Sequence, residues 1–328
     1  EGLLDAVFAT STVAAGVNFP ARTVVFFNSD RFNGRDFMPL TPTEFHQMTG
    51  RAGRRGMDNI GFAIAVPGRY MDMQHVVRLL AAAPSDVLSQ IRINFSMVLN
   101  LLLSHTPPEV ETLLERSFAT YLLTPGTSKK SAKTGIEGRS KFLWQDFMRH
   151  LKFLQEHAYV QSDGALTSDG FWASKLRVDQ PLLIAEGFRR QAFPSDQPAL
   201  MAAIFSCFVF ERESDDRIDA AHLPKVLLDA FLHIKETLSP FARAMLAGGF
   251  EARPIFLRPA AAIFAWAAGQ PWEKALAIAE MEEGIFASLI LRTADNLRHI
   301  IGLRDIFPEA AVDHHNADFF IIYMFNHK

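Results

Sequence analysis

Two short apolar runs near the start of the chain are the feature that most constrains its fold. Residues 23–27 (TVVFF) and 61–66 (GFAIAV) have the continuous apolar character of buried strands in a parallel sheet, and a third such run covers residues 3–8. Between them, Thr41, Pro42 and Glu44 predict the start of a helix, with Thr41 as its N-cap. Residues 1–84 are therefore expected to form an α/β unit built on a parallel sheet.

Beyond residue 85 the pattern changes to helical periodicity. Helices are expected over 88–102, 108–121 and 142–157, and the segment 124–140 predicts an exposed basic loop. Asp163 and Gly164 predict a two-residue hairpin turn. Helices followed by a hairpin indicate a winged-helix domain over 85–180. Further helical patterns at 199–211, 224–237 and 284–302 indicate an all-α helical bundle over 181–328, ending in an apolar tail at 303–328.

The overall charge argues against a nucleic-acid binder that acts through bulk basicity. The 33 Lys and Arg against 36 Asp and Glu give a net charge of -3, so any nucleic-acid site must be a local groove. No apolar run approaches the roughly 20 residues of a membrane span, and we expect no secretory signal. The one cysteine, Cys207, lies in an apolar run and favours a reducing, cytoplasmic compartment.

The most informative segment is QMTGRAGRRG at residues 47–56. Its glycines alternate with arginines and let the backbone and the guanidinium groups approach an anion closely. The planar guanidinium fork stays charged and binds phosphate oxygens through paired hydrogen bonds. A solvated basic turn is the alternative for an isolated arginine triplet, but the full Q-x-x-G-R-x-G-R spacing is more specific than that.

This segment resembles motif VI of superfamily 2 helicases, and residues 9–21 (ATSTVAAGVNFPA) resemble motif V of the same superfamily. The leader PLTPTEF at 39–45 is similar to the superkiller-type branch, which includes the exosome-associated RNA helicases. Further segments resemble that branch: 89–103 with 117–118, 202–211, 266–269, 283–284 and 292–298. The resemblance therefore extends to about residue 302, and the tail beyond it matches nothing that we can name.

The resemblance implies that residues 1–84 are the C-terminal part of a second RecA-like lobe. Arg51 and Arg54 would be arginine fingers, which stabilise charge on the phosphoryl group transferred from ATP. The residues implied to contact the nucleotide are Gln47, Gly50, Gly16 and Asn18. Those implied to contact a nucleic-acid strand are Thr10, Ser11 and Thr12 of motif V, with Arg292, Asp295 and Arg298 on a ratchet-type helix.

Two absences limit the activity expected of this chain. It has no G-x-x-x-x-G-K-S/T phosphate loop and no D-E-x-H sequence. The resemblance places both in a first RecA-like lobe upstream, which would hold ATP and Mg²⁺. The resemblance implies part of an ATP-dependent helicase that unwinds RNA 3′ to 5′ and binds single-stranded RNA, with DNA as the alternative. Because the two motifs are absent, we expect this chain to be inactive by itself. The alternative is a non-catalytic module that binds nucleic acid or docks a partner.

Structural roles compete with the functional ones at several positions. Trp266 and Trp272 could stack on bases, but core packing is favoured for tryptophans in a helical bundle. His314 and His315 fit no zinc spacing, so no metal site is expected. The segment 124–140 stands where the exosome-associated relatives carry a stalked arch, which predicts an archless form. A purely structural helix over 284–301 would turn these residues inward: Leu289, Thr293, Leu297 and Ile300.

Overall fold

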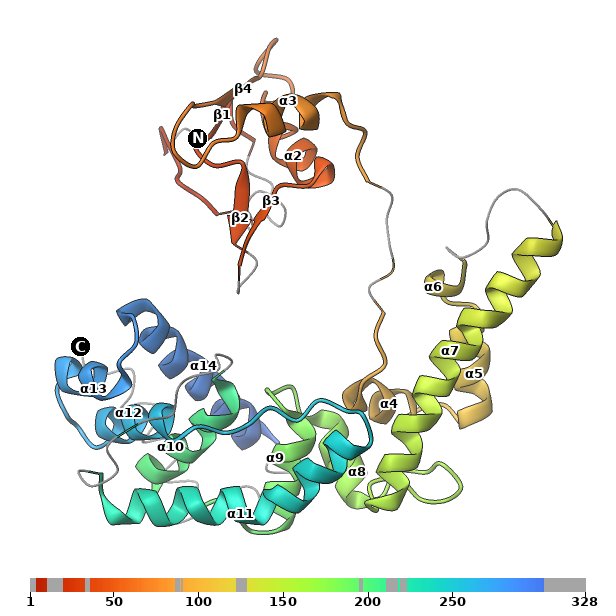
Figure 1. Ribbon diagram of the computed structural model, residues 1–328, viewed down its shortest axis with the longest axis vertical. Coiled ribbons are helices and arrows are strands. Elements are labelled where there is room, and N and C mark those ends of the chain that lie inside the picture. Colours follow the sequence, from red (N-terminus) through yellow and green to blue (C-terminus); the bar gives the residue numbers. More distant parts are fainter. Residues whose placement is uncertain are drawn as a thin grey trace. The chain divides into compact units, whose positions relative to one another are not determined.

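The computed structural model describes residues 4–10, 20–32, 36–85, 89, 91–121, 129–194, 197–210, 218 and 223–303. Its contacts divide the chain into two compact units, residues 1–89 and 90–328 (Figure 1). Each unit has its own hydrophobic core. The division lies close to the boundary expected at residue 84.

The first unit contains the parallel strand pair that the apolar runs predict. Strand β1 (Thr23–Phe26) pairs in parallel with β4 (Phe62–Ala65), and Thr23 lies opposite Phe62. Strands β2 (Asp30–Phe32) and β3 (Phe37–Pro39) form a short antiparallel ribbon that was not predicted. The described part of this unit also contains helices α2 (Pro42–Thr49) and α3 (Met73–Ala81) (Figure 1). Its core consists of Phe26, Leu40, Phe45, Met71, Val76 and Leu79.

The strand expected over residues 3–8 does not form in the described residues 4–8. Leu4 and Phe8 are 67% and 91% exposed, so the described part of this run is not buried in a core. A strand needs a hydrogen-bonding partner, and the described part of the unit offers none to this segment. Val25 of β1 and Ile64 of β4 are exposed, at 44% and 47%, so the burial expected of these strands from their apolar character is wrong for most of their residues.

The second unit is helical and is built around α10 (Pro198–Val209). Nine of the twelve residues of α10 are buried, as expected for a helix that is apolar on all sides. It packs against α11 (Lys225–Ala247), α12 (Leu257–Ala267) and α14 (Glu283–Gly302) (Figure 1). The remaining helices are α4 (Phe95–Leu101), α5 (Pro107–Glu115), α6 (Phe118–Tyr121), α7 (Lys129–Glu156), α8 (Ser168–Lys175), α9 (Pro181–Arg189) and α13 (Trp272–Ala279).

One core runs through the second unit across the boundary expected at residue 180. A buried polar cluster joins the two sides of that boundary. The hydroxyl of Tyr159 donates to the carboxylate of Glu186 at 2.9 Å, and Glu186 is fully buried on α9. Arg189 and Arg190 pair with the same carboxylate. Burial raises the pKa of Tyr159, so its hydroxyl stays protonated and able to donate.

Several expected elements of the second unit differ from those observed. The basic loop expected over 124–140 is helical from Lys129 onward, where α7 extends the predicted helix toward the N-terminus in spite of Gly135 and Gly138; residues 124–128 lie outside the described part of the chain. The helix expected over 88–102 is reduced to α4. By contrast, α11 continues ten residues past 237, because Leu238, Phe241 and Met245 keep its buried face apolar.

The hairpin expected around Asp163 and Gly164 is reduced to a single antiparallel bridge between Val160 and Leu166. The turn is longer than two residues: the amide of Gly164 donates to the carbonyl of Gln161, and the amide of Gln161 donates to the carbonyl of Ala165. Gly164 adopts a φ of 92°, a conformation that glycine adopts without strain. The winged-helix fold is therefore not established by this segment.

Candidate functional site

Helix α2 leads directly into the arginine-rich segment of motif VI. Its N-terminus is the predicted capping box: the amide of Thr41 donates to Glu44 at 2.9 Å, and the amide of Glu44 donates to the Thr41 hydroxyl at 3.3 Å. Arg31 forms an ion pair with Glu44. Burial raises the pKa of Glu44, but the hydrogen bonds from Thr41 and the charge of Arg31 lower it overall. The helix ends at Gly50, with Gln47 exposed in its last turn.

The motif VI loop (residues 50–58) is held by the end of motif V. The amide of Ala21 donates to the carbonyl of Arg51 at 3.0 Å, and the amide of Gly53 donates to the carbonyl of Ala21 at 2.8 Å. Gly53 has a φ of 91°, which favours glycine. Gly61, just before β4, lies so close that a Cβ there would come within 2.4 Å of the Ala52 carbonyl carbon. Ala21, the last residue of motif V, is therefore joined to the motif VI loop by backbone hydrogen bonds.

Arg54 is held on this loop by an acidic residue that the sequence did not single out. Its Nε donates to Oδ2 of Asp58 at 2.8 Å, and its Nη2 donates to Oδ1 at 3.0 Å. The amide of Arg54 also donates to Oδ2, at 2.9 Å. These hydrogen bonds lower the pKa of Asp58 to about 2, so the carboxylate is ionised at neutral pH.

The other predicted residues of this unit have different surroundings. Arg51 is partly buried beside the backbone of Ala21, whereas Arg55 is exposed, as expected of a surface residue. Thr10 is exposed. Four predicted residues lie outside the described part of the chain: Ser11, Thr12, Gly16 and Asn18.

Helix α14 has one buried face and one exposed face. The residues expected to turn inward are all buried: Leu289, Thr293, Leu297 and Ile300. The exposed face carries Ser288, Leu291, Asp295 and Arg298 at helical spacing. Arg298 forms a 2.8 Å ion pair with Asp295, and their side chains are 49% and 71% exposed. The structural and the strand-binding roles considered for this helix therefore fall on opposite faces.

Arg292 lies between these faces and is held by the connection from α8 to α9. Its Nη2 donates to Asp179 at 3.0 Å. Asn296, one turn further along, donates to the same carboxylate at 3.3 Å and accepts from the amide of Asp179 at 3.2 Å. Arg253 also faces Asp179, at 3.9 Å. Arg292 therefore differs from Arg298, because it helps to fasten α14 to a segment more than 100 residues earlier.

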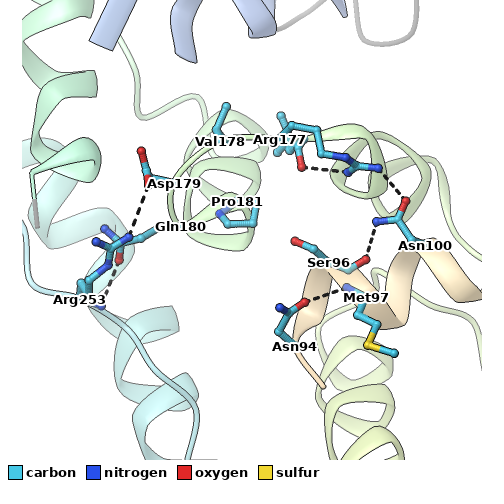
Figure 2. Close-up of a pocket in the computed structure, with 11 residues that line it drawn as sticks. Asn94, Ser96, Met97, Asn100, Arg177, Val178, Asp179, Gln180, Pro181 and Arg253 are labelled. Carbon is cyan, nitrogen blue, oxygen red and sulfur yellow. Dashed lines mark hydrogen bonds and ion pairs between the residues drawn. The ribbon is translucent and has the colours of Figure 1, made fainter. Parts of the chain in front are cut away.

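An open groove lies beside this connection, with a volume of about 500 Å³. Figure 2 shows Arg177 and Asn100 at one side and Asp179 and Arg253 at the other. Nη2 of Arg177 donates to the amide oxygen of Asn100 at 2.8 Å. Of the residues predicted to bind nucleotide or strand, none of those that the structure describes lines this groove.

Trp266 and Trp272 pack in the body of the second unit, in the structural role that the sequence analysis favours. Their rings meet edge to face with centroids 5.4 Å apart, and Trp272 also packs against Phe286 at 4.9 Å. The indole of Trp272 donates to Glu283 at 3.0 Å. His314 and His315 and the tail from residue 304 lie outside the described residues. Among the residues that are described, no three His, Cys, Asp or Glu side chains gather as metal ligands would.

Comparison with known proteins identifies relatives for much of the chain. Residues 163–317 match the family model of the DSHCT (NUC185) domain. Superkiller complex protein 2 of Mus musculus is 36% identical over 184 residues, which are 56% of this chain and 14% of that protein. Exosome RNA helicase MTR4 of Homo sapiens is 42% identical over 134 residues, 40% of this chain and 13% of that protein.

A bacterial protein is similar over a comparable stretch. Probable helicase HelY of Mycobacterium tuberculosis is 43% identical over 120 residues, 37% of this chain and 13% of that protein. This chain therefore matches only 13–14% of the length of these three relatives. None of the helices in the described part of the chain has the length and apolar character needed to cross a membrane.

Proposed function

Because this chain is related to the C-terminal regions of superkiller-type superfamily 2 helicases, we propose that it forms this part of an ATP-dependent helicase that unwinds RNA 3′ to 5′. The observation that carries the proposal is the motif VI loop. Two backbone hydrogen bonds fix this loop: the amide of Ala21 donates to Arg51, and the carbonyl of Ala21 accepts from Gly53. Arg54 lies on the loop with a side chain that is 41% exposed. A loop fixed in this way can present a cation to a phosphate without reorganising during the reaction.

The arginines of the loop would act on ATP as fingers. Arg54, and with it Arg51, would stabilise the negative charge that develops on the transferred phosphoryl group. Gln47 and Gly50 would contact the nucleotide from the end of α2, together with Gly16 and Asn18 of motif V. ATP and Mg²⁺ would be held mainly by a first RecA-like lobe that carries the phosphate loop and the DExH sequence. The chain by itself would then not hydrolyse ATP.

The exposed face of α14 would grip the translocating strand. Arg298 would bind a backbone phosphate in exchange for its ion pair with Asp295, which is exposed and therefore weak. Arg292 would support the helix through Asp179 and reach the strand only at its edge. Thr10, Ser11 and Thr12 would bind phosphates on the other unit, because hydroxyl groups hold a phosphate without reading sequence.

The segment between the lobe and the bundle would be an archless winged helix. In this proposal, helices α7 and α8 would be two of its helices, and the turn at Gly164, with its single antiparallel bridge, would be a reduced wing. A cytoplasmic location would suit Cys207, which is fully buried in α10.

Replacing Arg298 by alanine is expected to weaken binding of single-stranded RNA by the full-length protein. Loss of one phosphate contact should reduce the slope of log affinity against log salt by about 1. Fluorescence anisotropy across a salt series measures this slope. Arg243→Ala is the matched control, since Arg243 is an exposed arginine of α11 whose side chain donates a hydrogen bond to the Ser239 hydroxyl. Equal slopes for the two variants would remove Arg298 from the strand site.

Unwinding of tailed duplexes tests the proposed activity. The full-length protein with ATP should separate an RNA duplex that has a 3′ single-stranded tail and leave a 5′-tailed duplex intact. Separation of the 5′-tailed duplex alone would contradict the direction, and preference for DNA would contradict the substrate. Binding without any unwinding would favour the non-catalytic module.

A further inference from the structure

We propose that Asp58 is a positioning residue for ATP hydrolysis, which holds Arg54 in the orientation that an arginine finger needs. The proposal rests on the role proposed above for Arg54 and extends it to a second residue. Asp58 would not touch the nucleotide itself. It would act by fixing both the main chain and the side chain of Arg54.

The contact uses one edge of the guanidinium group and leaves the other available. Nε and Nη2 donate to the two oxygens of Asp58 in a fork, the arrangement in which arginine binds a carboxylate most strongly. Within the described part of the chain, Nη1 makes no hydrogen bond. Nη1 and the remaining hydrogen of Nη2 form a second fork, at the end of the side chain. That fork can receive two oxygens of a phosphoryl group while the Asp58 contact stays in place.

The loop backbone fixes the pair in a closed turn. The amides of Met57 and Asp58 both donate to the carbonyl of Arg54, at 3.0 and 2.9 Å. Gly56 makes this turn possible with a φ of 78°. The amide of Arg54 completes the cycle by donating to Asp58. Because Gly53 is bonded to Ala21, the turn is also anchored to the segment that leads into β1. The direction of the Arg54 side chain is therefore set before any ligand binds.

The side chain of Asp58 is much less exposed than that of Arg54, as expected if Asp58 positions Arg54 and Arg54 contacts the ligand. The side chain of Asp58 is only 8% exposed, whereas that of Arg54 is 41% exposed. The carboxylate thus lies under the guanidinium group, and the guanidinium group faces outward. The opposite hypothesis is that Asp58 keeps Arg54 away from the phosphoryl group. That hypothesis predicts that removing the carboxylate increases turnover.

Asp58→Asn in the full-length protein tests the proposal. The amide keeps the size of the carboxylate but loses its charge and one acceptor, so Arg54 loses its fork. We expect kcat for RNA-stimulated ATP hydrolysis to fall about 10- to 100-fold, as expected for misplacement of a catalytic group by about 1 Å. The KM for ATP and the affinity for RNA should stay unchanged. Asp229→Asn, an exposed aspartate on α11, is the matched control and should leave kcat unchanged.

A double variant separates positioning from a loss of folding. If Asp58 acts through Arg54, adding Asp58→Asn to Arg54→Ala should lower kcat no further. Binding of ADP with aluminium fluoride, which imitates the transferred phosphoryl group, should weaken in Asp58→Asn while binding of ADP alone does not. An additional loss in the double variant would overturn the proposal in favour of a structural role. So would normal or increased turnover of Asp58→Asn when Arg54→Ala is inactive. Normal turnover of Arg54→Ala would instead refute the proposed function.

Discussion

Replacing Arg54 by alanine in the full-length protein is expected to lower strand-stimulated ATP hydrolysis by about 10³-fold or more, the effect typical of an arginine finger. The reason is that the alanine removes the cation that we propose to stabilise the developing charge on the phosphoryl group. Binding of RNA should be unchanged, because the strand contacts are proposed to lie elsewhere. Steady-state hydrolysis and RNA anisotropy on the same preparation measure both quantities.

The neighbouring arginine supplies the control for this experiment. Arg55→Ala removes the same charge from an exposed position one residue away and should change turnover by no more than a few-fold. If Arg54→Ala retained normal turnover, the finger assignment would be wrong. If both variants lost activity equally, the effect would be one of general charge rather than of the position of Arg54.

Gly61→Ala is expected to disrupt the motif VI loop, because Gly61 lies directly against the backbone of that loop. The added Cβ would lie 2.4 Å from the carbonyl carbon of Ala52 and 2.5 Å from the amide nitrogen of Gly53, both of which are backbone atoms. The loop must then move and strain its hydrogen bonds to Ala21. Overpacking of this kind costs about 1–3 kcal/mol. We expect a lower melting temperature and a loss of hydrolysis, measured by calorimetry and by ATP turnover.

Gly68→Ala is the matched control for this substitution. Gly68 follows β4 in the same unit, and a Cβ there would meet no atom within 4 Å. The control should therefore melt and hydrolyse ATP like the unsubstituted protein. If Gly61→Ala behaved in the same way, the close approach between Gly61 and the motif VI loop would not be needed for function.

Local patterns predicted the start of one helix and two of the strands. The capping box at Thr41 formed as expected because residues three positions apart determine it, and the apolar runs of β1 and β4 formed strands that pair with each other. The prediction of a strand over 3–8 was wrong for the described residues 4–8. A strand forms only beside a hydrogen-bonding partner strand, and hydrophobic periodicity does not show whether such a partner is present. The prediction of a loop over 124–140 was wrong for residues 129–140. The glycines and serines of that segment suggested a loop, but α7 extends through residues 129–140.

The candidate site was predictable to the extent that it is contiguous in sequence. Motif VI identified Arg54 and Arg51, and motif V identified the segment whose end at Ala21 binds the loop. Asp58 was missed, although its position four residues after Arg54, across a glycine, is a signal that could have found it. Asp179 carried no such signal. It meets Arg292 across 113 residues, so only the fold reveals that Arg292 is held differently from Arg298.

The most direct test of this account is ATP hydrolysis by the full-length protein and by this chain alone, each with and without single-stranded RNA. Matched DNA provides the comparison of substrates. We predict hydrolysis by the full-length protein only, with stimulation by RNA. Hydrolysis by the isolated chain, or a full-length protein whose rate no strand increases, would contradict the proposal that these residues complete a helicase motor.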